Sequence, residues 1–196
     1  EGTIQFQSGH IQVVRPDYFS QGVADPLAYL LPKDSAVLNT LESTPGVKLV
    51  APRLKVTGLI SHGETTVAFL AEGVAPSKEE ELSKGLSVAM GRNLSGPTAH
   101  EVILGRGLAR NLGVEPGDTV ALLATALGGG INGIEAKVVG IFTSTNQAYD
   151  NSALRLPLAL AQLLLRVEGT MDRARSRSIN SFSLCRASTK GDTWVI

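Results

Sequence analysis

Residues 101–142 constrain this fold more than any other stretch, because glycine and proline interrupt them at short intervals. The first apolar run, 102–104, has the length of a buried strand. Leu108 and Leu112 follow the end of that run at intervals of four residues, the spacing of one helix face. Gly113 stands where a residue with left-handed backbone would end such a helix.

A tight turn and two strands are expected next. The sequence Glu-Pro-Gly-Asp places Pro116 and Gly117 at the second and third positions of a type II turn, whose third residue needs a positive φ. Residues 119–124 are predicted to leave this turn as a strand. A glycine-rich connection over 128–133 then leads to a second strand over 134–142, where apolar and charged residues alternate. The stretch therefore predicts a compact α+β unit.

In the part of the chain before residue 101, glycine and proline mark the ends of the elements less clearly. The patterns predict a strand over 3–14 with a break near Ser8, and then a surface loop over 15–32 with one helical turn near 25–30. A helix should follow, capped by Asp34 or Ser35 and ended by Pro45 and Gly46. Two strands are expected next, over 47–60 and 65–74. The turn 61–64 joins the last two strands, so His62 and Glu64 are expected at an exposed hairpin tip. Two weak ligands on one turn favour solvated side chains over a metal site.

Further elements are predicted on both sides of residues 101–142. Ser77, with glutamates at 79–81, suits a helix start, because serine caps free amides and carboxylates complement the helix dipole. An acidic metal cluster there is disfavoured, since neighbouring helix residues point in different directions. The remaining predictions are a loop over 85–96 with a short strand at Leu86, Val88 and Met90, a polar stretch over 143–151 in which Asp150 caps or turns the chain, a strand over 152–156, and a helix over 157–166 that buries Leu160, Leu163 and Leu164.

Composition excludes several classes of function. Eighteen basic residues balance eighteen acidic ones and only 5% of residues are aromatic, so neither charge nor stacking favours nucleic acid. Cys185 is the single cysteine and cannot form an internal disulfide. No run approaches the roughly 20 apolar residues of a membrane span. Residues 1–3 lead into a strand-like alternation, so no signal peptide is expected.

A catalytic role is disfavoured by the motifs. His10, His62 and His100 are the available bases, but the sequence has no nucleophile elbow, zinc-protease helix or phosphate-binding loop. The pair Gly105 and Gly107 opens a helix after a strand, yet Arg110 stands where a dinucleotide fingerprint needs its third glycine. We therefore expect no enzyme activity, no cofactor, no metal and no ATP binding.

An ordered set of motifs carries a resemblance to a known family. The set reads Leu-Gly-Arg-Gly-Leu-Ala at 104–109, Leu-Gly-Val at 112–114, Pro-Gly-Asp-Thr-Val at 116–120 and Val-Val-Gly-Ile-Phe at 138–142, flanked by Gly-His-Ile-Gln at 9–12, Tyr-Asp at 149–150, Leu-Pro-Leu at 156–158 and Ala-Gln-Leu-Leu at 161–164. Over residues 9–169 the chain resembles the MacB-type periplasmic core domain of ABC transporter permeases, a group that includes the lipoprotein-releasing permeases.

The resemblance implies an α+β fold in which a larger βαββ-containing subdomain carries a smaller inserted α+β subdomain. The larger subdomain would comprise 1–76 and 144–169, and the insertion 77–143. Arginine at every second position from 173 to 177 departs from the family pattern. Residues 170–196 are therefore expected to be either a divergent edge strand that buries little, followed by a loosely ordered end, or sequence unrelated to the native protein. An RNA-binding arginine tail is the third alternative, which the lack of interleaved aromatic residues disfavours.

The resemblance also implies a function. The chain would be a non-catalytic fragment on the periplasmic face of the bacterial inner membrane, tethered by absent membrane helices and driven by a cytoplasmic ABC ATPase. A second permease copy or a periplasmic protein would be its partner, and it would couple ATP-driven motion to export or lipoprotein release. His62, Glu64, Ile131 and Asn132, on two exposed tips, are the expected partner contacts. The alternative is a freestanding soluble binding module of the small-barrel type.

Overall fold

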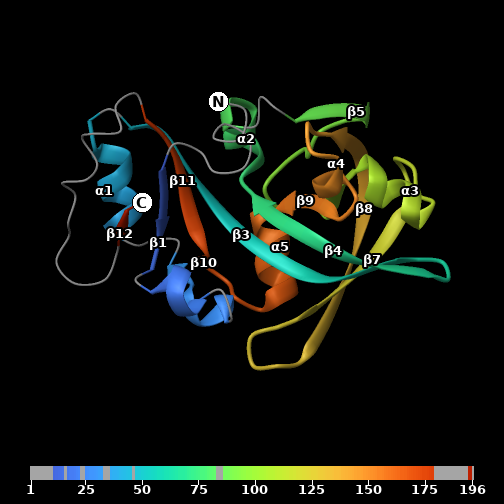
Figure 1. Ribbon diagram of the computed structural model, residues 1–196, viewed down its shortest axis with the longest axis horizontal. Coiled ribbons are helices and arrows are strands. Elements are labelled where there is room, and N and C mark those ends of the chain that lie inside the picture. Colours follow the sequence, from blue (N-terminus) through green and yellow to red (C-terminus); the bar gives the residue numbers. More distant parts are fainter. Residues whose placement is uncertain are drawn as a thin grey trace.

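The computed structural model describes residues 11–15, 17–22, 25–32, 36–45, 47–82, 86–178 and 194–195 (Figure 1). In chain order the elements are β1 (Ile11–Val14), η2 (Tyr18–Gly22), η3 (Pro26–Tyr29), β2 (Leu31–Pro32), α1 (Ala36–Ser43), β3 (Val47–His62), β4 (Thr65–Val74), α2 (Pro76–Leu82), β5 (Ser87–Gly91), β6 (Glu101–Gly105), α3 (Arg106–Leu112), β7 (Thr119–Thr125), β8 (Ile131–Thr143), α4 (Gln147–Asp150), β9 (Ala153–Pro157), α5 (Leu158–Leu165), β10 (Thr170–Met171), β11 (Arg173–Ser178) and β12 (Trp194–Val195). This mixture confirms the predicted α+β class. None of the helices in these ranges combines the length and hydropathy that a membrane crossing requires.

Six strands form a closed ring, which we call the barrel. β3 pairs with β4 antiparallel and β4 with β9 parallel. β9 continues to β6 antiparallel, and β6 to β8 parallel. β8 pairs with β7, and β7 returns to β3, both antiparallel. The ring of paired strands is therefore closed. β5 pairs with β8 as an additional strand outside the ring.

The barrel encloses the main hydrophobic core. Alternate residues of β3, among them Leu54, Val56 and Ile60, point inward because side chains of a strand alternate between its faces. α5 supplies Leu164 and α3 supplies Leu108 to the same cluster. In Figure 1, β3 and β4 pass in front of α5, and no described helix covers their front face.

A second part of the sheet lies beside the barrel. β11 pairs with β1 on one side and with the first half of β3 on the other, and β12 pairs with β1. The predicted divergent edge strand is therefore wrong, because β11 is an internal strand. Arg173 and Ala174 are buried in this strand, whereas the alternating arginines predicted a strand that buries little. The burial comes from packing on the face of the strand, because Ala174 belongs to a second hydrophobic cluster with Leu31 of β2, Leu41 of α1 and Met171 of β10.

Most of the predicted helix ends and turns are confirmed. Gly113 ends α3 with a φ of 68°, Gly117 occupies its turn with a φ of 118°, and Gly63 has a φ of 56° at the β3–β4 tip. The carboxylate of Asp150 accepts hydrogen bonds from the Ser144 backbone N–H and hydroxyl, so its predicted turn role is confirmed.

Several boundaries differ from the prediction. α2 begins at Pro76, so Ser77 lies inside the first turn and is not its cap. β8 begins at Ile131, which places Asn132 and Gly133 in the strand and shortens the glycine-rich connection. The predicted loop over 15–32 contains η2 and β2 beside the expected helical turn. α4 was also not expected, because four residues are too few to show a helical period.

The predicted buried face of α5 is partly wrong. Leu163 is 43% exposed, whereas Leu160 and Leu164 are buried as expected. Nearly every residue of α5 is apolar, so its periodicity could not select one face. The predictions for residues 3–10, Asp34, Ser35 and Gly46 lie outside the described residues. The division into a larger subdomain and an insertion stays a prediction, since the sheet runs through both.

Candidate functional site

The first expected contact surface is the tip between β3 and β4. Gly63 provides the left-handed residue of the turn, and Glu64 beside it is exposed. His62, the last residue of β3, is half-buried. Below the turn the hydroxyls of Ser61 and Thr66 share a hydrogen bond of 2.9 Å. The hairpin projects from the barrel at the right of Figure 1, so a partner could reach Glu64 from several directions.

The second expected surface is the tip between β7 and β8, where two large apolar side chains face solvent. Leu127 is 55% exposed and Ile131 is 78% exposed. Asn132 plays a different part, because its side-chain amide donates to the carbonyl oxygens of Leu163 and Leu164, both at 3.0 Å. The Asn132 amide therefore ties the tip to the end of α5, while Ile131 is free to contact a partner.

The two tips do not form one site. Ser61 pairs with Ala121 near the start of β7, whereas Ile131 pairs with Thr125 at its end. The β3–β4 tip therefore lies beyond one end of β7 and the β7–β8 tip beyond the other, as Figure 1 also shows. His62 and Glu64 on the one hand, and Ile131 and Asn132 on the other, are two separate candidate surfaces.

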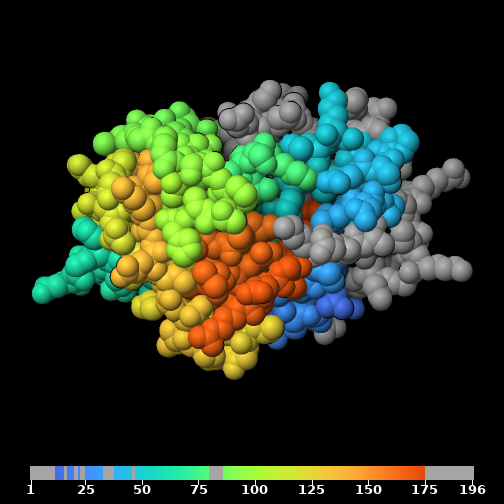
Figure 2. Space-filling model, turned by 180° about the vertical axis from the view of Figure 1, so that it is seen from behind, coloured from blue at the N-terminus to red at the C-terminus, as the bar shows by residue number. Residues whose placement is uncertain are grey.

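A cavity of about 310 Å³ lies along α5, on the face of the molecule opposite to the one seen in Figure 1. Figure 2 shows this side, with α5 at the surface between the segment leading to β6 and the β7–β8 tip. The lining residues are Thr98, His100, Ala159, Leu160, Gln162, Leu163 and Glu168. His100, one of the three candidate bases, faces this cavity, whereas His62 is on the distant β3–β4 tip. His10 and Cys185 lie outside the described residues.

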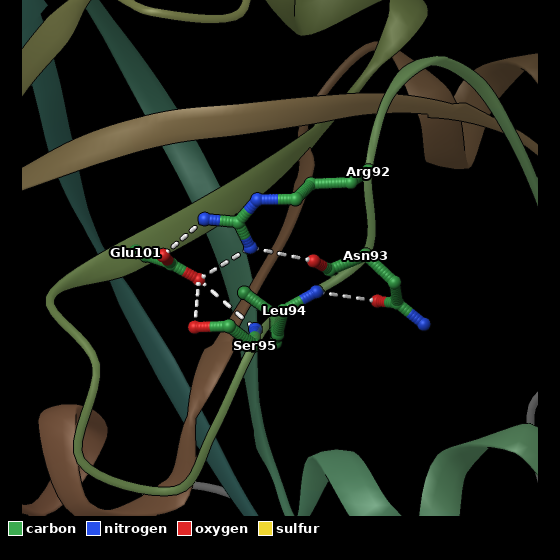
Figure 3. A network of polar contacts seen from close by, with 5 residues as sticks. All are labelled: Arg92, Asn93, Leu94, Ser95 and Glu101. Carbon is green, nitrogen blue, oxygen red and sulfur yellow. Dashed lines mark hydrogen bonds and ion pairs between the residues drawn. The ribbon is translucent and has the colours of Figure 1, made fainter.

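The segment beside the cavity is fixed by a polar network centred on Glu101 (Figure 3). One carboxylate oxygen accepts from Arg92 Nη1 at 3.0 Å and from the Ser95 backbone N–H and hydroxyl at 3.0 and 2.9 Å. The other oxygen accepts from Arg92 Nη2. Because these donors stabilise the ionised form, the pKa of Glu101 falls from 4.5 to about 2, with the Arg92 contact as the largest cause.

This pKa predicts an acid-sensitive loop. Glu101 binds its proton less readily in the folded chain, so its contribution to stability is fully present above pH 4.5 and is lost as pH falls toward about 2. We expect the protection of the Ser95 amide, the ratio of its intrinsic exchange rate to its observed rate at the same pH, to fall over that interval. Glu101→Gln should give the same low protection at pH 7. An NMR titration of the Glu101 carboxyl carbon with a midpoint at 4.5 or above would contradict the network.

The most unusual site lies inside the fold. Arg53 from β3, Glu72 from β4, Glu79 from α2 and Arg155 from β9 form a buried group that we call the charge cluster. Their side chains are exposed by only 1%, 10%, 5% and 3%, respectively. Two positive and two negative charges balance each other, as burial requires. Tyr149 packs nearby, and burial raises its pKa.

The sequence contains a signal for this cluster in three of its strands. Arg53, Glu72 and Arg155 each interrupt a run of apolar strand residues, and a charge in such a position needs a partner. Glu79 was assigned only a helix-dipole role, and the structure adds the cluster contacts. Among the described residues, no group of three or more His, Cys, Asp and Glu side chains is placed to hold a metal.

Comparison with known proteins identifies the family. The sequence matches the MacB-like periplasmic core domain family over residues 2–182. The expected end of the resemblance after Gly169 is therefore wrong. The fold is similar to the periplasmic region of MacB from Actinobacillus actinomycetemcomitans, with a TM-score of 0.65, 14% identity and coverage of 95% of this chain and 87% of that one.

A second solved structure agrees with the first. The extracellular domain of YknZ, a noncanonical ABC-type transporter of Gram-positive bacteria, superposes with a TM-score of 0.62 at 15% identity. The alignment covers 87% of this chain and 84% of that one. At these identities the structures establish a shared fold, and the family match covers nearly the whole sequence. The chain therefore belongs to the MacB-like periplasmic core domain family.

Proposed function

We propose that this chain is the extracytoplasmic domain of an ABC transporter permease and that it transmits motion between the membrane part of the permease and a substrate or partner outside. ATP would be hydrolysed on a separate cytoplasmic ATPase. The proposal covers export and lipoprotein release, because members of one family can share a fold and differ in cargo. One observation carries it: the course of β3.

β3 connects the two parts of the sheet as one uninterrupted strand of 16 residues. Its first half pairs with β11, beside β1, and these strands are near the two ends of the sequence. Its second half lies in the barrel, paired with both β4 and β7, and ends at the β3–β4 tip. At roughly 3.3 Å per residue, the strand spans about 50 Å.

The course of β3 favours the transmission of motion over a catalytic function. β3 is paired with β11 over its first half and with β4 from Arg53 to the tip, and Arg53 is paired with both strands. A sharp bend at this overlap would break ladder hydrogen bonds, so we expect a displacement of β11 to be carried along β3 to the β3–β4 tip. In a permease of this family, membrane helices would precede and follow the domain, and their movement would act first on β1 and β11. The tip with Glu64 and the tip with Leu127 and Ile131 would contact the substrate or partner.

Charge and polarity changes at the two tips test the proposal in the full-length transporter. Glu64→Lys and Ile131→Asp should leave the fold intact, since both side chains are exposed, and should lower transport without lowering basal ATP hydrolysis to the same extent. The matched control is Met90→Asp on β5, an exposed residue that pairs with Ile141 at the end of β8 opposite the β7–β8 tip. Normal transport in both tip variants, with expression confirmed, would remove the tips from the mechanism.

A second candidate function is favoured by the closed barrel, which is what a small-barrel binding module would show. In that case the chain would bind a ligand by itself, with the cavity beside α5 as the nearest site. The gene discriminates between the two functions. A reading frame that extends into apolar membrane spans on both sides of these residues would support the permease domain, and one that does not would support the module.

A further inference from the structure

We infer that α2 is a releasable latch, held on the barrel by the contact of Glu79 with Arg53 and Arg155. The latch itself follows from the charge cluster alone, and its use during transport rests on the proposed function. Three members of the cluster are fixed on strands, and only Glu79 comes from a helix. Movement of α2 is therefore the simplest rearrangement that would open the cluster.

The distances show that Glu79 carries the closest contacts. Its two carboxylate oxygens lie 2.6 Å from Arg53 Nη2 and 2.9 Å from Arg155 Nη1. Glu72 is farther away, at 3.5 Å from Arg53 Nη1 and 3.6 Å from Arg155 Nη2. If α2 moved away, Glu72 would be the one carboxylate of the charge cluster left beside the two arginines. The surface left behind would carry a net positive charge, which water would have to solvate.

The chemistry of the contact suits a reversible attachment better than a permanent one. Buried charges give up their hydration, so a charged contact of this kind is seldom more stable than an apolar one of the same size. The hydrogen bonds are also incomplete: Arg53 Nε is buried and has no hydrogen-bond partner among the described residues. Water can satisfy every one of these groups once the cluster opens, which lowers the cost of release relative to that of an exposed apolar face.

Release of α2 would change how the barrel and the rest of the sheet are connected. Lys78, the residue before Glu79, donates to the Val50 carbonyl oxygen at 2.8 Å and contacts Glu42 of α1 at 3.1 Å. One side of α2 therefore contacts α1 and the first half of β3, and the other contacts the barrel. With α2 attached, the part of the sheet beside β11 and the barrel are joined by α2 as well as by β3, by the packing of Leu27 and Leu30 on the barrel core, and by the hydrogen bond from Gln162 to the Thr170 carbonyl oxygen. Release of α2 would remove one of these connections.

Hydrogen exchange on the whole 196-residue chain tests the latch. In Glu79→Gln at pH 7, we expect the α2 amides to exchange at least about tenfold faster than in the parent, while β6 and β8 amides keep the parent rate, because local opening does not require global unfolding. Lys78→Met is the matched control, since it removes a partly exposed ion pair from the same helix, and it should change α2 exchange by less than about twofold.

Chemical rescue separates charge from packing. Glu79→Ala leaves a gap beside two arginines, and sodium acetate should restore slow exchange in α2, whereas sodium chloride at the same ionic strength should not. If Glu79→Gln or Glu79→Ala does not fold, Glu79→Asp, which keeps the charge on a shorter side chain, is compared with the parent in the same way. Slow α2 exchange in the variant that folds would overturn the latch.

Two further outcomes would also overturn it. Faster exchange shared equally by α2, β6 and β8 would mean that Glu79 only stabilises the whole fold. An effect of Lys78→Met as large as that of Glu79→Gln would assign the attachment to the other side of the helix. These experiments need no transport measurement, so failure of the latch and failure of the permease proposal are distinguishable: the tip variants test the second and leave the first untouched.

Discussion

Leu108→Ala is expected to lower the free energy of unfolding by roughly 2 to 5 kcal/mol, the range measured for large-to-small changes in well-packed cores. Leu108 is fully buried on α3 and belongs to the cluster that fills the barrel. The surrounding strands are held in a closed ring and cannot collapse into the space that the side chain leaves. Urea denaturation followed by circular dichroism measures the change.

Leu163→Ala on α5 is the control for this change. The same atoms are removed from a side chain that is 43% exposed, so the loss should be clearly smaller than for Leu108→Ala. The comparison also tests the corrected orientation of α5, because the sequence pattern had placed Leu163 in the core. Equal losses for the two variants would show that the core has been assigned to the wrong residues.

Gly58→Ala should destabilise the fold by about 1 to 3 kcal/mol or more, which is the usual cost of forcing extra volume into a packed site. A Cβ at this position would lie 2.1 Å from the backbone oxygen of Leu123, far inside contact distance. Gly58 pairs with Ala124 where β7 returns to β3, so the added methyl group separates the two strands that close the barrel.

Gly130→Ala provides the comparison for Gly58→Ala, since a Cβ added there meets no atom within 4 Å. Its thermal unfolding midpoint should stay close to that of the parent. If Gly58→Ala also melts at the parent temperature, β3 and β7 are not held together as closely as the ring requires, and the barrel would have to be open at this point.

Local structure was largely predictable because single residues dictate it. Gly113 and Gly117 were assigned positive φ from their place between apolar runs, and both have it. The closure of the barrel was not predictable in the same way. It depends on the pairing of β7 with β3, for example of Ala124 with Gly58, which are far apart in sequence. No local pattern states which distant strand will be the neighbour.

The motif of Gly105 and Gly107 has a packing role that the sequence did not predict. The sequence indicated only that the third glycine of a dinucleotide fingerprint is missing. In the structure a Cβ at Gly105 would lie 2.3 Å from the Asp150 carbonyl oxygen, and one at Gly107 would lie 1.9 Å from Asn151 Oδ1. The two glycines let α3 approach α4 closely.

The candidate sites were predictable only where exposure decides them. Glu64 and Ile131 were expected on exposed tips and are exposed there, whereas Asn132 is one residue inside β8 and holds α5. Whether the tips contact a partner stays a prediction. The charge cluster depends on four residues from four elements, and its geometry exists only after β3, β4 and β9 have paired and α2 has packed on them.

The central claim is that β3 carries motion from the strands near the chain ends to the β3–β4 tip. Spin labels on the full-length transporter test it through electron-paramagnetic-resonance distances, with one pair at the exposed positions Lys48 and Glu64 and another at Glu64 in two permease copies. We expect the Lys48 to Glu64 distance to stay constant between the nucleotide-free and ATP-trapped states, while the distance between the two tips changes. A changing distance along β3 with stationary tips would contradict the claim.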